Sequence, residues 1–170
     1  TAMGVENLYA VGTRTEQQDL VAGVAKCMFC NCREENPADF IKEQTQDAGV
    51  DIVFECVGVN ESINNAVSLV RAGGEVVLVG NPAGDIGFDK QIYWKILRQQ
   101  LKIYGTWNSS FTKEEEDDWH QAVKAIQAGK IRPSAQITQR FSFDRLHDGL
   151  EVMRDKAVFT NKVMIGRKVP

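Results

Sequence analysis

Glycines at the ends of predicted β-strands are the residues whose spacing points most directly to chemistry. Gly12, Gly58, Gly80 and Gly105 each end, or closely follow, a short apolar run. Open α/β sheets bind ligands beyond the carboxyl ends of their strands, where a residue without a Cβ lets the backbone approach a flat cofactor. Alternatively, glycine simply ends strands and begins turns, as in any α/β domain. Its repetition favours a nucleotide-binding crevice.

Cysteine is the residue type in this sequence that could bind a metal ion. Cys27, Cys30 and Cys32 lie close together. Positions 27 and 30 of an extended strand point to opposite faces, however, and the two residues between them lack the turn of a zinc knuckle. We therefore predict no metal at these thiols, and expect them and Cys56 to be buried and free in a reducing compartment.

Histidine could supply a proton shuttle. His120 and His147 both fall in helical patterns, and neither has a partner that the sequence identifies. A solvent-facing position on a helix is the simpler interpretation for both.

The elements that must position these residues alternate between short β-branched runs and helical patterns up to about Gly105. This alternation predicts βαβ units around a parallel sheet, and runs that are apolar at consecutive positions predict strands buried on both faces. The predicted strands are Leu8–Val11, Lys26–Cys32, Asp51–Cys56, Glu75–Val79 and Leu101–Tyr104.

Capping residues mark the helices between these strands. Asn36 before a proline, Asn60 and Asp89 each precede apolar residues at helical spacing. A later helix is expected after the capping box formed by Thr112 and Glu115.

That later helix also carries charge and end signals. The acidic run 114–118 is expected to form its solvated first turn, which the helix dipole favours, and Gly129 to end it in a left-handed conformation. After Arg132 and Pro133 the pattern changes to a strand over Ala135–Arg140, a helix over Asp144–Arg154 and a strand over Lys162–Ile165.

Composition excludes several classes of function. Of 170 residues, 43% are hydrophobic and 25% are charged, which is typical of a soluble globular protein. Twenty Lys and Arg against 23 Asp and Glu give a net charge of −3, without the basic excess that nucleic acid or anionic lipid requires. No apolar run is long enough to span a membrane and no secretory signal is visible, so we expect a cytoplasmic protein.

Three segments together resemble a known family. Residues 51–58 (DIVFECVG), 72–80 (AGGEVVLVG) and 95–107 (KILRQQLKIYGTW) are similar to the cofactor domain of medium-chain, zinc-type alcohol and polyol dehydrogenases. The last segment is most similar to the polyol-phosphate branch, of which galactitol-1-phosphate dehydrogenase is the type. The resemblance implies an α/β fold with a Rossmann-type doubly wound parallel sheet, and hydride transfer between a secondary alcohol and nicotinamide.

The same resemblance assigns cofactor contacts position by position. The backbone at these positions would fix which face of the nicotinamide ring meets the substrate. Trp107 could equally be an aromatic cover for the sheet end, and Lys162 an ordinary surface residue. The assigned positions are Cys56, Val57 and Val59 for the adenosine-side ribose and adenine, Val79, Gly80 and Asn81 for the nicotinamide ribose, Gly105, Thr106 and Trp107 for the carboxamide, and Lys162 for the phosphates.

One departure from the family pattern concerns the centre of the sheet. The family's opening strand and its G-x-G-x-x-G turn do not occur in these 170 residues. We therefore expect the 170 residues alone to bind a dinucleotide weakly. We also expect a sheet that is split, closed directly across the gap, or completed by another chain.

A second departure concerns the choice of cofactor. The acidic residue that normally ends the family's second strand is Gly12, and Thr13 and Arg14 follow it. Without the carboxylate, a guanidinium and a hydroxyl can bind a 2′-phosphate, so NADP is favoured over NAD. Alternatively, Arg14 is a solvated turn residue.

A third departure concerns zinc and the domains. The family's zinc ligands belong to a catalytic half that these residues do not match, so we expect zinc only in the intact enzyme. Residues 1–133 are interpreted as an incomplete NAD(P)-binding Rossmann domain and residues 134–170 as part of the catalytic domain. We expect these residues alone to be inactive, and a small-molecule polyol or polyol phosphate to be the substrate of the intact enzyme.

Two other functions remain open from the sequence. A non-catalytic assembly module could pair through its sheet edges, since family members form dimers beside the strand Leu101–Tyr104. A methyl-donor-binding transferase has a similar sheet, but fits less well.

Overall fold

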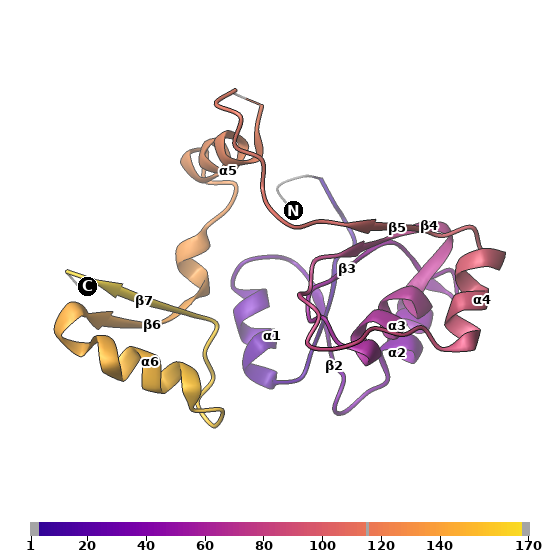
Figure 1. Ribbon diagram of the computed structural model, residues 1–170, viewed down its shortest axis with the longest axis horizontal. Coiled ribbons are helices and arrows are strands. Elements are labelled where there is room, and N and C mark those ends of the chain that lie inside the picture. Colours follow the sequence, from indigo (N-terminus) through magenta and orange to yellow (C-terminus); the bar gives the residue numbers. More distant parts are fainter. Residues whose placement is uncertain (1–3, 115, 168–170) are drawn as a thin grey trace. The chain divides into compact units, whose positions relative to one another are not determined.

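The computed structural model describes residues 4–114 and 116–167. Helices and strands alternate through most of the chain, as Figure 1 shows. The elements are β1 Tyr9–Gly12, α1 Thr15–Ala22, β2 Met28–Asn31, α2 Pro37–Thr45, β3 Val50–Glu55, α3 Asn60–Leu69, β4 Val70–Leu78, α4 Lys90–Arg98, β5 Lys102–Gly105, α5 Asp118–Gln127, the 3-10 turn η1 Pro133–Gln136, β6 Ile137–Ser142, the 3-10 turn η2 Phe143–Arg145, α6 Leu146–Arg154 and β7 Lys162–Gly166.

The described strands form three separate sheets. β1 pairs with β2, β3–β4–β5 form a three-stranded sheet, and β6 pairs with β7. The three-stranded sheet is parallel throughout, and so is the pair β6–β7. Among the described strands, direct closure of the sheet across the gap is therefore not observed, and completion by another chain stays a prediction. The chain forms two compact units, one of residues 1–29 with 110–170 and one of residues 30–109.

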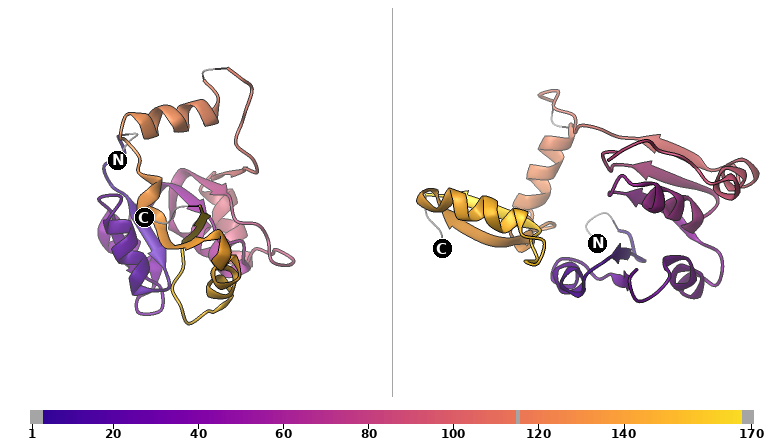
Figure 2. Two further views of the ribbon diagram at one scale, coloured as in Figure 1. Left: turned by 90° about the vertical axis from the view of Figure 1, so that its left-hand side faces the viewer. Right: turned by 60° about the horizontal axis from the view of Figure 1, so that its bottom comes forward.

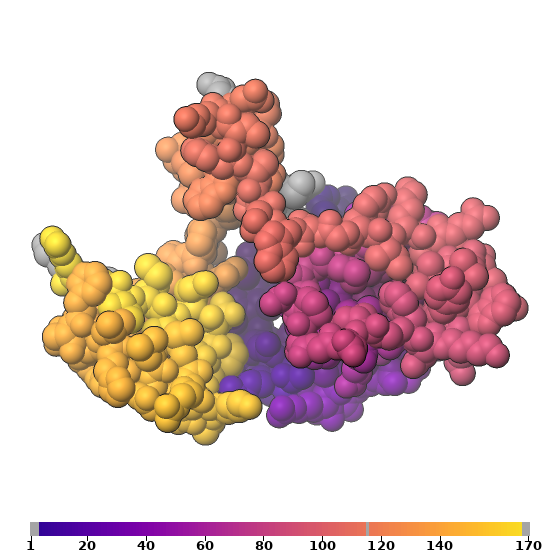
Figure 3. Space-filling model, viewed as in Figure 1, coloured from indigo at the N-terminus to yellow at the C-terminus, as the bar shows by residue number. Residues whose placement is uncertain are grey.

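The unit 30–109 has its core on one face of the three-stranded sheet. α3 and α4 cover this face (Figure 1), and Val67, Val70 and Val76 are almost completely buried there. Partly buried side chains from β3, β5 and α4 pack around them. On β3, Ile52 and Phe54 are exposed, so the prediction that this strand is buried on both faces is wrong. These alternate residues point away from the face that α3 and α4 cover. The space-filling view shows α4 at the surface of this unit (Figure 3).

Local start signals explain where these helices begin. The Asn36 side chain accepts a hydrogen bond from the Ala38 amide, and Pro37 is the first residue of α2, as the sequence predicts. Asp89 precedes α4 as expected, whereas Asn60 is the first residue of α3 instead of its cap.

The other unit contains the strand–helix–strand segment β6–α6–β7. α6 packs along the two strands, as Figure 2 shows. Gly149 of α6 is buried. The helix lies close to the strands here, since a Cβ on Gly149 would lie 3.2 Å from the Phe141 ring and 3.3 Å from Ile165. The 3-10 turns replace the first residues of the strand and helix expected over 135–140 and 144–154.

The start of α5 differs from the prediction. The helix begins at Asp118, capped by Asp117, so the expected box with Thr112 is wrong and Glu115 lies outside the described residues. Of the described residues in the acidic run, Glu114, Glu116 and Asp117 precede the helix and only Asp118 lies in its first turn. Gly129 follows the helix with a φ of 68°, as expected for a left-handed end.

Burial of the cysteines is also only partly as expected. All four are free, but Cys30 alone among them is buried, while Cys32 and Cys56 are exposed. The prediction of buried thiols is wrong for these two because they lie at or just beyond the ends of β2 and β3, where packing stops. In the part of the chain that the structure describes, no helix is long and apolar enough to cross a membrane.

Candidate cofactor-binding site

Three turns lie at one end of the parallel sheet β3–β4–β5. Gly105 is in register with Leu78, and the Thr106 amide donates to the Leu78 carbonyl over 3.1 Å. The amides of Val79 and Gly80 both donate to the Glu55 carbonyl, over 2.8 and 2.9 Å. The predicted contact positions 56–59, 79–81 and 105–107 therefore come together at the carboxyl ends of these strands.

Two of these turns interlock through glycine. Gly58 has a φ of 82°, and a Cβ there would lie 2.1 Å from the Asn81 carbonyl oxygen. A Cβ on Gly80 would lie 2.3 Å from the Gly58 nitrogen. Both distances are too short for any other residue, so these glycines allow two backbones to approach each other. The sequence pattern suggested that glycine is needed here to let a cofactor approach. In the structure, glycine is needed because the two turns contact each other.

A buried carboxylate organises the turn between β3 and α3. One oxygen of Glu55, Oε1, accepts hydrogen bonds from the amides of Val57 and Gly58 over 2.8 and 2.9 Å, and from the Ser62 hydroxyl over 2.7 Å. Glu55 is 3% exposed. Since its backbone carbonyl holds Val79 and Gly80, this one residue ties together the turns after β3 and β4.

The environment keeps Glu55 charged. Burial raises its pKa, but the hydrogen bonds from Ser62, Gly58 and Val57 outweigh burial and leave the pKa below its ordinary value. The amino end of α3 also favours a negative charge. The second carboxylate oxygen, Oε2, is buried and has no hydrogen-bond partner among the described residues. Sequence reasoning missed Glu55, although an acid inside a buried apolar strand is itself a signal.

Apolar side chains surround this end of the sheet. Val57, Val59, Val79 and Trp107 are all exposed, Trp107 by 78%. A Cβ on Gly105 would meet nothing within 4 Å. The three turns thus present an open, largely apolar surface with backbone groups between the side chains, as a flat ring system requires.

The fourth predicted turn belongs to the other unit. Gly12 ends β1, and Arg14 precedes the first residue of α1. The Gln17 side-chain oxygen accepts hydrogen bonds from the Thr13 amide over 2.8 Å and from the Arg14 amide over 3.1 Å. Gln17 was not singled out from the sequence, although a glutamine three residues after a helix cap is a known capping signal.

The Arg14 side chain is held by the segment before β7. Its Nη2 donates to the carbonyls of Lys156 and Ala157, over 3.0 and 3.5 Å, and its guanidinium lies 5.9 Å from the centre of the Phe159 ring. Arg14 is thus a partly exposed turn residue that these contacts hold, and its role in cofactor binding stays a prediction. Lys162 is the first residue of β7 and is exposed.

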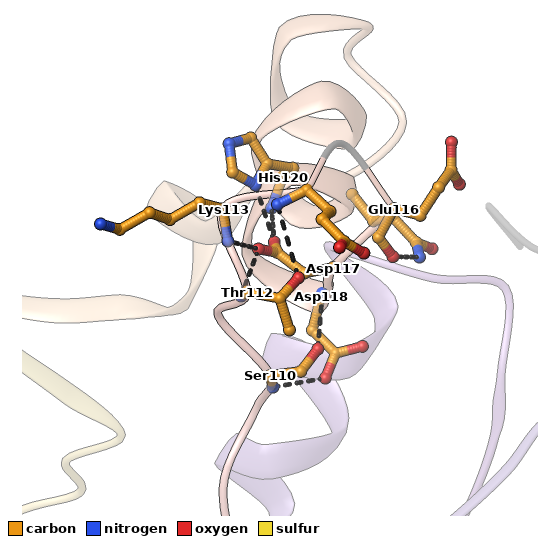
Figure 4. Close-up of polar contacts among 9 residues, drawn as sticks. Ser110, Thr112, Lys113, Glu116, Asp117, Asp118 and His120 are labelled. Atoms are coloured by element: carbon orange, nitrogen blue, oxygen red, sulfur yellow. Dashed lines mark hydrogen bonds and ion pairs between the residues drawn. The ribbon is translucent and has the colours of Figure 1, made fainter.

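A further polar cluster surrounds the start of α5 (Figure 4). The buried Asp117 carboxylate accepts hydrogen bonds from the amides of Thr112, Lys113 and His120, and from Nδ1 of the His120 ring over 2.8 Å. Burial raises the pKa of Asp117, but the hydrogen bonds from His120 and Thr112 more than offset this and lower it to about 2. Because an ionised carboxylate only accepts, Nδ1 carries the proton.

This cluster corrects the expectation for His120. The residue has a partner in Asp117 and its ring also stacks on Phe111, with the ring planes 7° apart. His147 matches the expectation, since its side chain is 83% exposed. Asp117 and His120 are three residues apart, a spacing that brings side chains together at a helix start.

Metal ligands do not gather in the described part of the chain. Residues 4–114 and 116–167 contain no group of three or more His, Cys, Asp or Glu side chains that could hold a metal ion. The described residues thus do not fit a zinc site.

Parallel strands, crossover helices and turns gathered at the strand ends define a Rossmann-type cofactor-binding domain. The sequence pattern of the zinc-binding dehydrogenase family matches residues 1–128, and the chain belongs to this family. The resemblance found in residues 51–58, 72–80 and 95–107 is thereby confirmed.

Curated relatives of the chain are longer proteins. L-threonine 3-dehydrogenase from Shewanella pealeana is 27% identical over 152 residues, which cover 89% of this chain and 42% of that protein. The enzyme of the same name from Shewanella baltica is 28% identical over 151 residues, with the same coverage of 89% and 42%. The chain spans less than half the length of these relatives.

Solved structures share the fold at lower identity. Galactitol-1-phosphate dehydrogenase from Escherichia coli superposes with a TM-score of 0.82 at 21% identity, over 95% of this chain and 46% of that one. A protein from Sinorhizobium meliloti 1021, described as a zinc-binding dehydrogenase bound to NADP, has a TM-score of 0.78 at 22% identity, over 96% and 46%.

Proposed function

We propose that this chain is the cofactor-binding part of an NAD(P)-dependent oxidoreductase. The enzyme would transfer hydride between a secondary alcohol, in a polyol or polyol phosphate, and nicotinamide. The observation that carries this proposal is the gathering of three turns at one end of a parallel sheet, tied together by Glu55. The names of the structural neighbours, which include a polyol-phosphate dehydrogenase and an NADP-bound protein, support it.

The residues of this chain would bind and orient the cofactor. Backbone groups of the interlocked turns fix the faces of the ribose and nicotinamide rings, and the nicotinamide supplies the hydride acceptor when it is bound. We propose the adenosine-side contacts at Cys56, Val57 and Val59, the nicotinamide-ribose contacts at Val79, Gly80 and Asn81, the carboxamide contacts at Gly105, Thr106 and Trp107, and a phosphate contact at Lys162.

NADP is proposed as the preferred cofactor. Gly12 places no carboxylate at the end of β1, and the Thr13 hydroxyl and Arg14 guanidinium follow. A 2′-phosphate would meet donors and a positive charge here, whereas a carboxylate would repel it. Nη2 donates to the carbonyls of Lys156 and Ala157, and on this proposal the 2′-phosphate would accept from the other guanidinium N–H groups.

Hydride transfer would need parts of the relatives that this chain does not span. We propose that residues 1–133 serve the cofactor, that residues 134–170 belong to a catalytic domain, and that zinc ligands lie in the remaining length of the intact, cytoplasmic enzyme. On this proposal the 170 residues alone are inactive, because they hold no metal-ligand group within the described ranges.

Titration with cofactors tests the proposal. The thermal midpoint of the chain should rise with NADPH, NADH and ADP-ribose, since a ligand that binds only the folded state stabilises it. NADPH should give the largest rise. Absence of any rise at millimolar concentration, confirmed by calorimetry, would refute cofactor binding. A larger rise with NADH would leave cofactor binding intact but refute the role of Arg14.

Assembly through sheet edges is the second candidate function. β3 and β5 are the outer strands of the three-stranded sheet, and Phe54 and Tyr104 on them are 65% and 46% exposed. Exposed apolar edges favour pairing with a second copy. Sedimentation velocity should then detect a homo-oligomer, and a monomer at all concentrations up to about 100 μM would exclude this function.

A further inference from the structure

The Gln17 side chain reaches back from the first turn of α1 to the end of β1. Its oxygen accepts hydrogen bonds from the amides of Thr13 and Arg14, over 2.8 and 3.1 Å. Both neighbours are donors, so the atom between them must be the oxygen of the amide and not its nitrogen. A carbonyl oxygen has two lone pairs, and both are used in this turn.

The same oxygen occupies the space next to Gly12. A Cβ on Gly12 would lie 2.5 Å from Gln17 Oε1 and 2.8 Å from Cζ of Phe29. Both distances are below the 3.0 Å that real Cβ atoms keep. A side chain at position 12 would therefore have to displace the ends of the Gln17 and Phe29 side chains, and the neutral Gln17 oxygen lies against the place that its first atoms would take.

This arrangement bears on the choice between two cofactors. In dinucleotide-binding folds, a carboxylate at the end of the second strand accepts a hydrogen bond from the ribose 2′-hydroxyl, or an arginine binds a 2′-phosphate. Here the side-chain acceptor at the strand end is neutral and already bonded to two amides. A ribose hydroxyl would have to compete for it, whereas the oxygens of a 2′-phosphate would find the guanidinium of Arg14.

We infer that Gln17 is a positioning residue that sets cofactor specificity. It takes the place of a strand-end acid and orders the Thr13–Arg14 backbone with a neutral acceptor. The Lys156 and Ala157 carbonyls hold the other end of Arg14. This inference rests on the proposed function, and it names 2′-phosphorylated adenosine as the group that the turn selects.

Gln17→Glu is the decisive variant because it changes charge and little else. A carboxylate can still accept both amide hydrogen bonds, so the turn should persist. Gln17→Met removes the acceptor without adding charge. Gln18→Glu is the matched control, since Gln18 is the same residue type one position later and is exposed. Each variant of the 170-residue chain is titrated with adenosine 2′,5′-bisphosphate and with 5′-AMP by calorimetry or NMR.

The wild-type chain should bind the bisphosphate more tightly than 5′-AMP. Gln17→Glu should lower the ratio of the two affinities roughly tenfold or more, because a unit charge would then face the 2′-phosphate at close range. Gln18→Glu should change the ratio by less than about threefold, because an exposed charge is screened. Hydrogen exchange at the Thr13 and Arg14 amides should stay slow in Gln17→Glu and become fast in Gln17→Met.

The possible results distinguish the inference about Gln17 from the proposed function. An unchanged affinity ratio in Gln17→Glu, with slow exchange retained, would overturn the inference and leave the proposed function intact. Loss of slow exchange in Gln17→Glu would overturn the claim that a carboxylate can take over the turn. If the wild-type chain binds neither probe, the proposed function fails and the inference fails with it.

Discussion

Replacing Glu55 by alanine should loosen both turns at the end of the sheet. The change removes the acceptor of three hydrogen bonds, from Val57, Gly58 and Ser62. The Gly58 amide lies in a buried environment, so it would lose its partner without gaining water. Glu55→Gln keeps an acceptor in the same place, removes the charge and replaces the other carboxylate oxygen by an NH2 group.

The expected magnitudes follow from these contacts. Three hydrogen bonds, each contributing about 1 kcal/mol or slightly more, give a loss of about 3 kcal/mol in the free energy of unfolding for Glu55→Ala. Glu55→Gln should lose about 1 kcal/mol, since hydrogen bonds to a charged acceptor are the stronger ones. Glu75→Gln is the matched control. Its carboxylate makes a partly exposed ion pair with Lys102 at 3.0 Å, which should contribute less than about 1 kcal/mol.

Urea unfolding can report on this unit alone. Trp94 and Trp107 lie in the unit 30–109, and Trp119 lies in the other unit. A Trp119→Phe background therefore restricts the tryptophan fluorescence to the unit 30–109. Since the pKa of Glu55 is lowered on folding, its charge stabilises the folded state above pH 4.5, its ordinary value, and this stabilisation is lost as the pH falls through the folded pKa. The difference between wild type and Glu55→Gln should therefore shrink below pH 4.5.

Two results would refute this reasoning. One is a loss in the free energy of unfolding for Glu55→Ala that is no larger than the loss for Glu75→Gln. The other is a difference between wild type and Glu55→Gln that grows as the pH falls, because that would mean that Glu55 is protonated in the folded protein near neutral pH.

Three further predictions concern other parts of the chain. Gly58→Ala should destabilise the protein by about 2 kcal/mol or more, because of its positive φ and the contact with Asn81, whereas Gly105→Ala should change the free energy of unfolding by less than about 1 kcal/mol; equal effects would contradict the interlocked turns. Asp117→Ala should reduce the helicity measured by circular dichroism at pH 7, and a variant as helical as wild type would contradict the cap. Because the pKa of Asp117 is lowered to about 2, the stabilisation by its charge should be complete above pH 3.8 and lost as the pH falls towards 2. Cys32 should react with a thiol reagent in the folded chain, whereas Cys30, which is 0% exposed, should react only on unfolding; mass spectrometry of the labelled peptides checks this, and early labelling of Cys30 would refute its burial.

Much of the fold could be predicted because burial leaves a plain pattern in the sequence. The runs 52–54 and 76–78 are apolar at consecutive positions, and both lie in strands of the parallel sheet. The bounds were less predictable. β4 begins at Val70, five residues before the predicted start, because Val70 pairs with Val50 beyond an irregularity in the register. Such a pairing depends on the neighbouring strand, which the residues of β4 alone do not reveal.

The polar contacts could not be predicted in the same way. The cap of α5 predicted from the sequence is Thr112 with Glu115, whereas the structure has Asp117, whose side chain accepts from the His120 amide. In the structure Asp117 accepts from the amides of Thr112 and Lys113 as well as from His120, so the loop before the helix folds back onto the cap. The choice is made by contacts that exist only after the loop has closed.

The strand-end glycines have structural reasons that their spacing did not reveal. Gly58 and Gly80 exclude a Cβ because two backbones meet there, whereas a Cβ on Gly12 would displace the ends of the Gln17 and Phe29 side chains. Gly105 alone of the four predicted positions has open space around it. Glycine therefore marks places within each unit where a turn packs closely against other groups. On the proposed function, the groups that hold these turns would help to select the ligand: the carboxylate of Glu55 in the unit 30–109 and the side-chain amide of Gln17 in the other unit.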